Sequence, residues 1–172
     1  HLSGMPVQHF IAACNANDVV TEFLKTENYQ IKKAVATISN AMDVGDPSNF
    51  IRILELLDHK FSGLKSLMSS YSVSDNQTRE TIKSVFHKEH YLPDPHGAVA
   101  YFALNEYLQK HPAQAGMFLE TAHPVKFYDV VEPVIGEVIP IPEPLKPLME
   151  KDKKSILMDA DFQQLREFLM NR

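Results

Sequence analysis

The residues best placed for chemistry lie in the stretch GMFLETAHPVKFYDVV, residues 116–131. A short apolar run ends at Glu120, and Thr121 and His123 follow before Pro124, which is expected to open a helix. In an open α/β sheet, ligands bind outside the carboxyl ends of the strands, so a hydroxyl at this junction is a candidate for a binding site. The alternative is that the Thr121 hydroxyl only caps the helix that follows. His123 either lines a pocket or satisfies the turn, and it is not assigned a catalytic role.

Three histidines in the stretch FHKEHYLPDPH form a second candidate site. His87 and His90 have a spacing that can place two metal ligands on one helix face, and His96 follows nearby. The stretch has no cysteine and no HExxH motif, so solvent-exposed histidines are the preferred interpretation and no metal is expected.

The only cysteine, Cys14, follows the apolar run HFIAA. It is expected inside a strand, as a small core residue rather than as a reactive thiolate. A single cysteine excludes a disulfide framework and favours a reducing compartment. The sequence also contains no GxSxG, GxGxxG or P-loop motif. Spacing alone therefore defines no complete active site, and no catalytic residue is assigned.

The stretch SNAMDVGDPSNF, residues 39–50, combines a strand end, a polar loop and a helix start. Such a succession can bind an anion through oriented backbone N–H groups. However, Asp43 and Asp46 bring negative charge to the same place, and loop and cap chemistry alone also accounts for the stretch. These residues are therefore not assigned to a site.

Strand-like runs must position these candidates. Four short apolar runs, typical of buried parallel strands, occur at residues 8–14, 34–39, 69–73 and 116–120. Helical patterns alternate with them, and βαβ units with right-handed crossovers form parallel sheets. The expected fold is therefore α/β, a mostly parallel sheet with helices on both faces. Thr121 is expected just past the carboxyl end of its strand.

Helices are indicated by apolar residues three and four positions apart, at residues 50–57, 82–86 and 160–171. Two helix starts are predicted where an aspartate precedes a proline, at Asp46 and Asp94. Ser74 and Gln77 fit a capping box at the start of a third helix.

Length suggests a single domain, because 172 residues can bury a core of their own. Residues 1–135 are expected to form its α/β core. The stretch EPVIGEVIPIPEPLKPL has prolines too dense for a helix or a central strand, so an extended path over the surface is predicted. Residues 136–172 are expected to pack on the same domain as a proline-rich strap and a C-terminal helix.

The charge balance, 17 basic against 22 acidic side chains, and the lack of a basic stripe argue against a nucleic-acid partner. No run has the length and apolarity of a membrane span or a signal peptide, so a cytoplasmic protein without membrane contact is expected. The first residue is His1, and HLSGMPVQHF is typical of a helix end, a turn and a strand. The chain is therefore expected to begin within a larger protein.

Five segments carry a resemblance to a known family: FIAACNANDVV, VATISNAMDVGDPSNFIRILEL, YSVSDNQTRETI, DPHGAVAY and TAHPVKF. Their order and their amino-acid sequences resemble those of threonine synthase, a pyridoxal-phosphate enzyme of fold type II, from about residue 7 to 135. The resemblance implies the C-terminal part of an enzyme that uses pyridoxal 5'-phosphate to convert O-phospho-L-homoserine and water to L-threonine and phosphate.

The resemblance also implies what this chain lacks. In the family, the Schiff-base lysine and the phosphate-binding loop lie upstream, in the N-terminal half of the enzyme, so the isolated chain is expected to be inactive. Lys126 in HPVKF is expected to be a surface residue and not that lysine. The family places a hydrogen bond to the pyridine nitrogen of the cofactor at the threonine of TAHP, here Thr121. Another pyridoxal-phosphate lyase of this kind, or a non-catalytic α/β interaction module, remains as an alternative.

Overall fold

The computed structural model describes residues 2–149, 151–152 and 154–171, and it contains a small parallel sheet of two strands. Strand β1 (Phe10–Cys14) pairs with β2 (Met68–Ser72), so that Phe10 lies opposite Met68 and Cys14 opposite Ser72. The Val73 N–H donates to the Cys14 carbonyl and extends the pairing beyond the strand ends. Two of the four predicted strands are thus confirmed, and the pair is parallel as expected.

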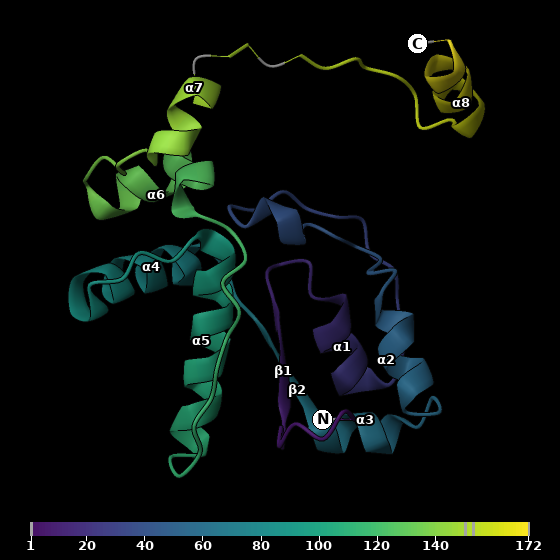
Figure 1. The fold of residues 1–172 in the computed structure, drawn as a ribbon. Coiled ribbons are helices and arrows are strands. Elements are labelled where there is room, and N and C mark those ends of the chain that lie inside the picture. The colour runs from purple at the N-terminus through teal and green to yellow at the C-terminus, as the bar shows by residue number, and fades with distance from the viewer. Residues whose placement is uncertain (1, 150, 153, 172) are drawn as a thin grey trace. The chain divides into compact units, whose positions relative to one another are not determined.

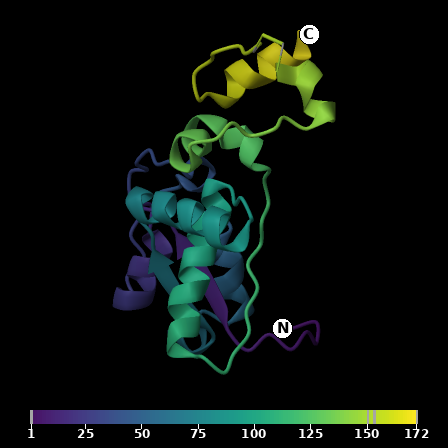
Figure 2. The ribbon, with the colours of Figure 1, turned by 90° about the vertical axis from the view of Figure 1, so that its left-hand side faces the viewer.

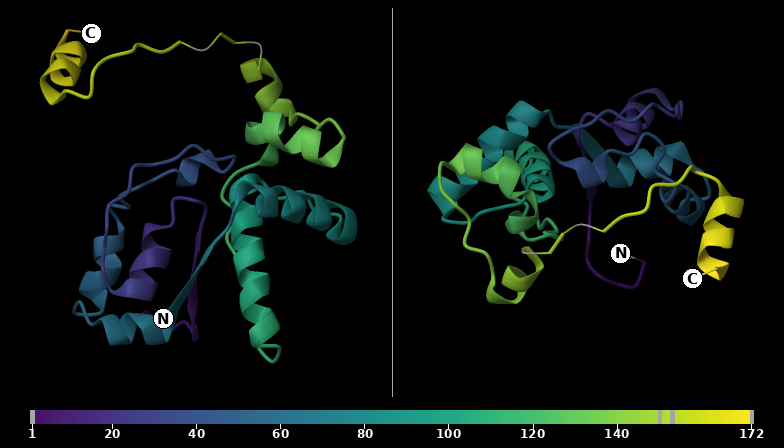
Figure 3. Two further views of the ribbon diagram at one scale, coloured as in Figure 1. Left: turned by 180° about the vertical axis from the view of Figure 1, so that it is seen from behind. Right: turned by 90° about the horizontal axis from the view of Figure 1, so that it is seen from above.

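Helices cover both faces of this strand pair (Figures 1 and 3). Helices α1 (Val19–Thr26) and α3 (Phe61–Leu67) contact the strands on one side, where α2 (Phe50–Leu56) also lies. Helix α5 (Pro95–Lys110) contacts β1 and β2 on the other side, and α4 (Asp75–Glu89) crosses its upper end (Figure 2). The α/β class with helices on both faces is therefore confirmed.

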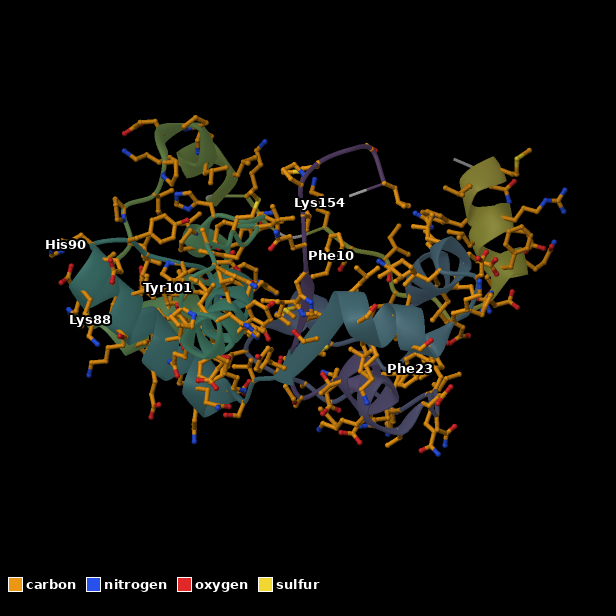
Figure 4. All side chains as sticks on the ribbon, turned by 90° about the horizontal axis from the view of Figure 1, so that it is seen from below. Phe10, Phe23, Lys88, His90, Tyr101 and Lys154 are labelled. Atoms are coloured by element: carbon orange, nitrogen blue, oxygen red, sulfur yellow. The ribbon has the colours of Figure 1, made fainter. Side chains whose placement is uncertain are left out.

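The core has two parts that follow from the apolar spacing of the helices. On one side Phe23, Leu24, Phe50 and Leu64 form a buried cluster, in which the Phe23 and Phe50 rings meet edge to face with centroids 5.7 Å apart. Phe23 lies among the side chains of α1 in Figure 4. On the other side the buried residues come from α4 and α5: Ile82, Val85, Ala98, Val99 and Ala103.

Two predicted strands are wrong. Residues 34–39 form no strand, because side chains take the place of a neighbouring strand. The Val35 N–H donates to Asn17 Oδ1, the Asn17 amide donates to the Val35 carbonyl, and the Thr37 N–H donates to Asp43 Oδ2. A short 3₁₀ helix, η1 (Asn40–Met42), follows.

Residues 116–120 also form no strand, because they pair with no strand in the described part of the chain. They run back along α5 instead (Figures 1 and 2). Gly116 lies so close to Leu104 that a Cβ atom on the glycine would approach the leucine Cδ1 to 2.4 Å. The Phe118 ring meets the Tyr101 ring edge to face, with centroids 5.6 Å apart. This course brings the residues that follow to the N-terminus of α5.

The predicted helices at 50–57, 82–86 and 160–171 are confirmed as α2, α4 and α8 (Phe162–Met170). Ser74 forms the predicted capping box with Gln77, and Asp94 caps α5 by accepting from the His96 N–H. The helix start at Asp46 is wrong. Helix α2 begins at Phe50, and the Asp46 carboxylate accepts instead from the Tyr29 hydroxyl, 3.0 Å away.

Pro124 opens a 3₁₀ helix, η2 (Pro124–Phe127), which leads into α6 (Tyr128–Ile135). Helix α6 continues through Pro133, so the prediction that this proline-rich stretch excludes a helix is wrong there. Burial of Val131 and Ile135 favours the helix despite the lost hydrogen bond.

Beyond α6, two short helices, η3 (Glu143–Leu145) and α7 (Lys146–Met149), carry Pro144 and Pro147 in their first turns. A proline costs little there, because first-turn N–H groups have no partner within the helix. The chain divides into two compact units, residues 1–139 and 140–172. Packing of residues 136–172 on the core stays a prediction.

Candidate functional site

Thr121 follows Glu120 in a segment that forms no strand, so its predicted place just past the end of a strand is wrong, and the residue is exposed. Its hydroxyl forms no hydrogen bond with the part of the chain that the structure describes. The cap of the next helix comes from His123, whose Nδ1 accepts from the Val125 N–H at 3.1 Å. The alternative in which Thr121 serves as that cap is therefore wrong, and the imidazole of His123 satisfies the turn.

Glu120 anchors this segment to the first turn of α5. Its Oε1 accepts from the Asp94 N–H at 2.8 Å, and its carboxyl group lies directly over Gly97. A Cβ atom at position 97 would be 1.5 Å from Glu120 Oε2, so this approach requires glycine. The backbone just before Thr121 is thus fixed to a helix that packs on the strands.

A second set of bonds joins the start of α5 to the η1 loop. Asp94 is fully buried, and its Oδ1 accepts from the His96 N–H at 2.8 Å and from His96 Nδ1 at 2.5 Å. The Ala41 N–H donates to His96 Nε2 at 3.1 Å. Because Nε2 accepts a hydrogen bond, Nδ1 must carry the proton, and the imidazole is neutral.

The two carboxyl groups beside α5 differ in their electrostatics. Burial favours the protonated form of Asp94, but the hydrogen bonds from His96 outweigh it and hold the pKa of Asp94 below its usual value. Burial and the neighbouring Asp94 charge together raise the pKa of Glu120 to about 7. Below pH about 7 the pair therefore holds one ionised carboxyl group, Asp94, and one protonated carboxyl group, Glu120.

A polar cluster lies at the carboxyl end of β1. The buried Asn15 amide donates to Thr37 Oγ1 at 2.8 Å and to Asp43 Oδ1 at 2.9 Å. Asn17 donates to the same Asp43 oxygen at 3.0 Å, and Thr37 Oγ1 donates to it at 2.7 Å. These bonds hold the loop that contains Asp43 against the end of β1. The Asp43 carboxylate therefore accepts its hydrogen bonds from neighbouring side chains of the fold.

A cavity of about 590 Å³ opens beside this cluster. Its lining combines apolar residues of β1 and α2 with four polar side chains: Asn15, Asn17, Asn49 and Arg52. The Asn15 and Asn17 amides donate within the fold, whereas the Asn49 amide and the Arg52 guanidinium are donors of the kind that binds carboxylate and phosphate groups. The stretch 39–50, considered above as an anion site, contributes Met42, Val44, Pro47, Asn49 and Phe50 to this lining. The cavity is therefore suited to a small anionic molecule with an apolar portion.

Sequence reasoning missed Asn15 and Asn17, although a signal for them exists. They directly follow the first predicted strand, and polar residues at the carboxyl end of a parallel strand are candidates for ligand binding. The same rule had selected Thr121. The contacts of Asp94 with Glu120 and of His96 with Ala41 have no such local signal.

Of the remaining candidates, His90 and Lys126 do not line the cavity, whereas Cys14 does. His90 lies at the outer end of α4 (Figure 4), in a left-handed backbone conformation, whereas His96 is bound to Asp94. Within the described residues, no group of three or more His, Cys, Asp or Glu side chains is arranged to hold a metal ion. Lys126 is exposed on η2. Cys14 ends β1 with its Sγ 3.8 Å from Ser70 Oγ.

No helix in the described ranges combines the length and the apolarity that a membrane crossing requires.

Comparisons with known proteins agree on one family. Residues 97–169 match the family profile described as threonine synthase, C-terminal. The chain is 44% identical over 169 residues to threonine synthase of Buchnera aphidicola subsp. Schizaphis graminum, which covers 98% of this chain and 38% of that protein. Against threonine synthase of Escherichia coli K12 it is 40% identical over 168 residues, covering 98% of this chain and 38% of that protein.

Solved structures give the same result. The crystal structure of threonine synthase from Escherichia coli superposes with a TM-score of 0.89 at 40% identity, covering 98% of this chain and 38% of that one. A threonine synthase from Brucella melitensis, solved with pyridoxal phosphate bound, has a TM-score of 0.81 at 26% identity, covering 98% of this chain and 41% of that one.

The fold and the site define an α/β protein with a partly polar cavity at the carboxyl end of a parallel strand, the place where ligands bind in open α/β sheets. The chain belongs to the threonine synthase family and corresponds to the C-terminal part of its members. It spans a little over a third of the length of the curated relatives that it matches. The resemblance inferred from the five sequence segments is confirmed.

Proposed function

We propose that this chain is the C-terminal part of a threonine synthase, a pyridoxal-phosphate lyase that converts O-phospho-L-homoserine and water to L-threonine and phosphate. The observation that supports the proposal is the 40% identity to the Escherichia coli enzyme, with a TM-score of 0.89, over 98% of this chain. The N-terminal half of the same enzyme is its partner, and the cytoplasm is its location. Neither nucleic acid nor membrane has a part in this function.

Thr121 is the residue that we assign to the cofactor. Its hydroxyl is exposed and without a partner among the described residues, and the preceding residue is anchored to α5. These features fit a group that donates a hydrogen bond to the pyridine nitrogen. When bound, pyridoxal phosphate withdraws electrons from the substrate carbons.

The choice of a hydroxyl at this position has a chemical consequence. A hydroxyl donates to an unprotonated ring nitrogen, whereas a carboxylate stabilises the protonated ring and makes it a stronger electron sink. Thr121 thus limits electron withdrawal to the moderate level that suits elimination and addition of water. Asp94, His96 and Glu120 contribute by holding the Thr121 segment in place, and none of them is assigned to a proton transfer with substrate.

The cavity beside β1 supplies a place for the anionic groups of the substrate. The amides of Asn15 and Asn17 donate within the fold and hold the loop, so the donors that we assign to the substrate are the Asn49 amide and the Arg52 guanidinium, which also line the cavity. Phosphohomoserine carries a phosphate and a carboxylate, and both suit donors of this kind.

A substrate assay tests the proposal. The intact parent protein, loaded with pyridoxal phosphate, is expected to release phosphate and L-threonine in equal amounts from O-phospho-L-homoserine. O-phospho-L-serine, which is one methylene shorter, serves as the comparison substrate. Preferred turnover of that compound would assign the protein to another pyridoxal-phosphate lyase, and no turnover of either would favour a non-catalytic module.

The 172-residue chain alone provides a second test. We expect no saturable absorption band with pyridoxal phosphate and no turnover, because neither the amine nor the phosphate loop is supplied. An absorption band that appears in the wild-type chain and disappears in Lys126→Ala would contradict the expectation that the Schiff-base lysine lies upstream of this chain.

A further inference from the structure

Two buried oxygen atoms beside Thr121 have no partner. Asp94 Oδ2 and Glu120 Oε2 are both inaccessible to solvent, and neither has a hydrogen bond from the residues that the structure describes. Ionised carboxylates only accept hydrogen bonds, so two of them side by side cannot satisfy each other. A proton on one of them lets it donate to the other, and the Asp94 and Glu120 side chains lie close enough for such a bond.

The charges around the pair favour this arrangement. The titratable groups that face Glu120 are Asp94, His96 and Tyr91. His96 is neutral because its Nε2 accepts from the Ala41 N–H, and burial raises the pKa of Tyr91, which keeps the phenol uncharged as well. Burial and the Asp94 charge outweigh the bond from the Asp94 N–H, so Glu120 holds a proton until the pH exceeds about 7.

The segment that leads to Thr121 depends on this contact. Met117 and Leu119 are largely exposed, and the segment has no strand ladder to hold it. Its polar attachment to α5 is the carboxyl group of Glu120, which accepts from the Asp94 N–H through Oε1. The second oxygen, Oε2, lies over Gly97 and has no hydrogen-bond partner among the described residues.

We propose that Glu120 is a positioning residue: it shares one proton with Asp94, and the protonated pair holds Thr121 in place for its ligand. The identity of that ligand as a pyridine ring rests on the proposed function, whereas the shared proton does not. Loss of the proton places two negative charges together in a buried site. The carboxyl group of Glu120 then leaves the Asp94 N–H, and Thr121 loses its fixed position.

The matched variant is Glu120→Gln. A glutamine keeps the acceptor for the Asp94 N–H, and its amide donates to Asp94 Oδ2 at every pH, so it imitates the protonated acid permanently. Glu120→Ala removes both bonds. Glu80→Gln, on the exposed face of α4, removes a carboxylate away from the site and serves as the control.

The first readout is the pyridoxal-phosphate dissociation constant of the intact parent protein as a function of pH. In the wild type and in Glu80→Gln we expect it to rise about tenfold for each pH unit above about 7, until the segment is released. In Glu120→Gln this rise should vanish, and in Glu120→Ala binding should be weak throughout. A Glu120→Gln variant with the pH profile of the wild type, or with the weak binding of Glu120→Ala, would overturn the proposal.

The second readout needs no cofactor and separates this proposal from the proposed function. In the intact parent protein labelled with ¹³C at glutamate side chains, the signal missing from Glu120→Gln is that of Glu120. The pH titration of the Glu120 signal is expected to have its midpoint near pH 7. In Asp94→Asn this midpoint should fall, because the asparagine amide donates a hydrogen bond to an ionised Glu120. A midpoint close to that of ordinary glutamates would overturn the shared proton. A midpoint near pH 7 in a protein that does not bind pyridoxal phosphate would support the shared proton and reject only the assigned cofactor.

Discussion

Gly97→Ala probes the contact between α5 and the Thr121 segment. A glycine-to-alanine change inside a helix ordinarily stabilises a protein by about 0.5–1 kcal/mol. At this position the new Cβ atom would be 1.5 Å from Glu120 Oε2 and 2.3 Å from its Cδ, so the carboxyl group must move away. The Asp94 N–H then loses its acceptor, which costs about 1–3 kcal/mol. The loss outweighs the gain, and we expect a net destabilisation of about 1–2 kcal/mol.

Urea unfolding followed by circular dichroism measures this change as a shift of the midpoint at constant slope. Gly63→Ala in α3 is the matched control, because its nearest neighbour would be Lys60 Cβ at 3.9 Å. The control is expected to stabilise the protein by about 0.5–1 kcal/mol. In a Glu120→Ala background the carboxyl group is gone, so Gly97→Ala should become neutral or stabilising there. Equal stabilisation by Gly97→Ala and Gly63→Ala in the wild type would refute the contact.

Three further predictions concern stability. The pKa of Glu120 is raised from 4.5 to about 7, mainly by burial, so the folded state keeps a proton that the unfolded chain releases. This stabilisation is complete below pH about 4.5 and is lost as pH rises to about 7. The unfolding free energy of the wild type should therefore fall over this window by roughly 1–2 kcal/mol relative to that of Glu120→Gln. If the difference between the two unfolding free energies stays constant from pH about 4.5 to about 7, the raised pKa of Glu120 is contradicted. Ser74→Ala removes the capping box of α4 and should cost about 1 kcal/mol in urea unfolding, whereas Ser74→Asp should cost much less. Leu64 is 1% exposed and Leu157 is 96% exposed, so Leu64→Ala should lower the unfolding free energy by about 3 kcal/mol and Leu157→Ala should hardly change it. Similar melting temperatures for these two variants would reject the core described above.

Local patterns predicted the features that depend on neighbouring residues. The capping box at Ser74 and the cap at Asp94 were predictable because each needs only residues within one turn. The strands at 10–14 and 68–72 were predictable because both are short runs of small or apolar residues bounded by polar ones.

Features that depend on distant partners were not predictable in this way. Residues 34–39 read as a strand, yet their backbone groups bond to side chains of Asn17 and Asp43. The anchor of the Thr121 segment joins Asp94 to Glu120, 26 positions apart, and no spacing rule relates two such residues. The assignment of Thr121 to the cofactor stays a prediction, made from its place after an apolar run and from the family resemblance.

The dissociation constant of pyridoxal phosphate for Thr121→Val and Thr121→Ser tests the central claim most directly, in the intact parent protein at pH below about 7. Valine keeps the shape of threonine and removes the hydroxyl, and an unsatisfied ring nitrogen costs about 1–3 kcal/mol. The constant is therefore expected to rise roughly ten- to a hundredfold in Thr121→Val and to stay near the wild-type value in Thr121→Ser. His123, not Thr121, caps the next helix, so melting temperatures of the cofactor-free variants should not change. Wild-type affinity in Thr121→Val would contradict the assignment of Thr121 to the cofactor.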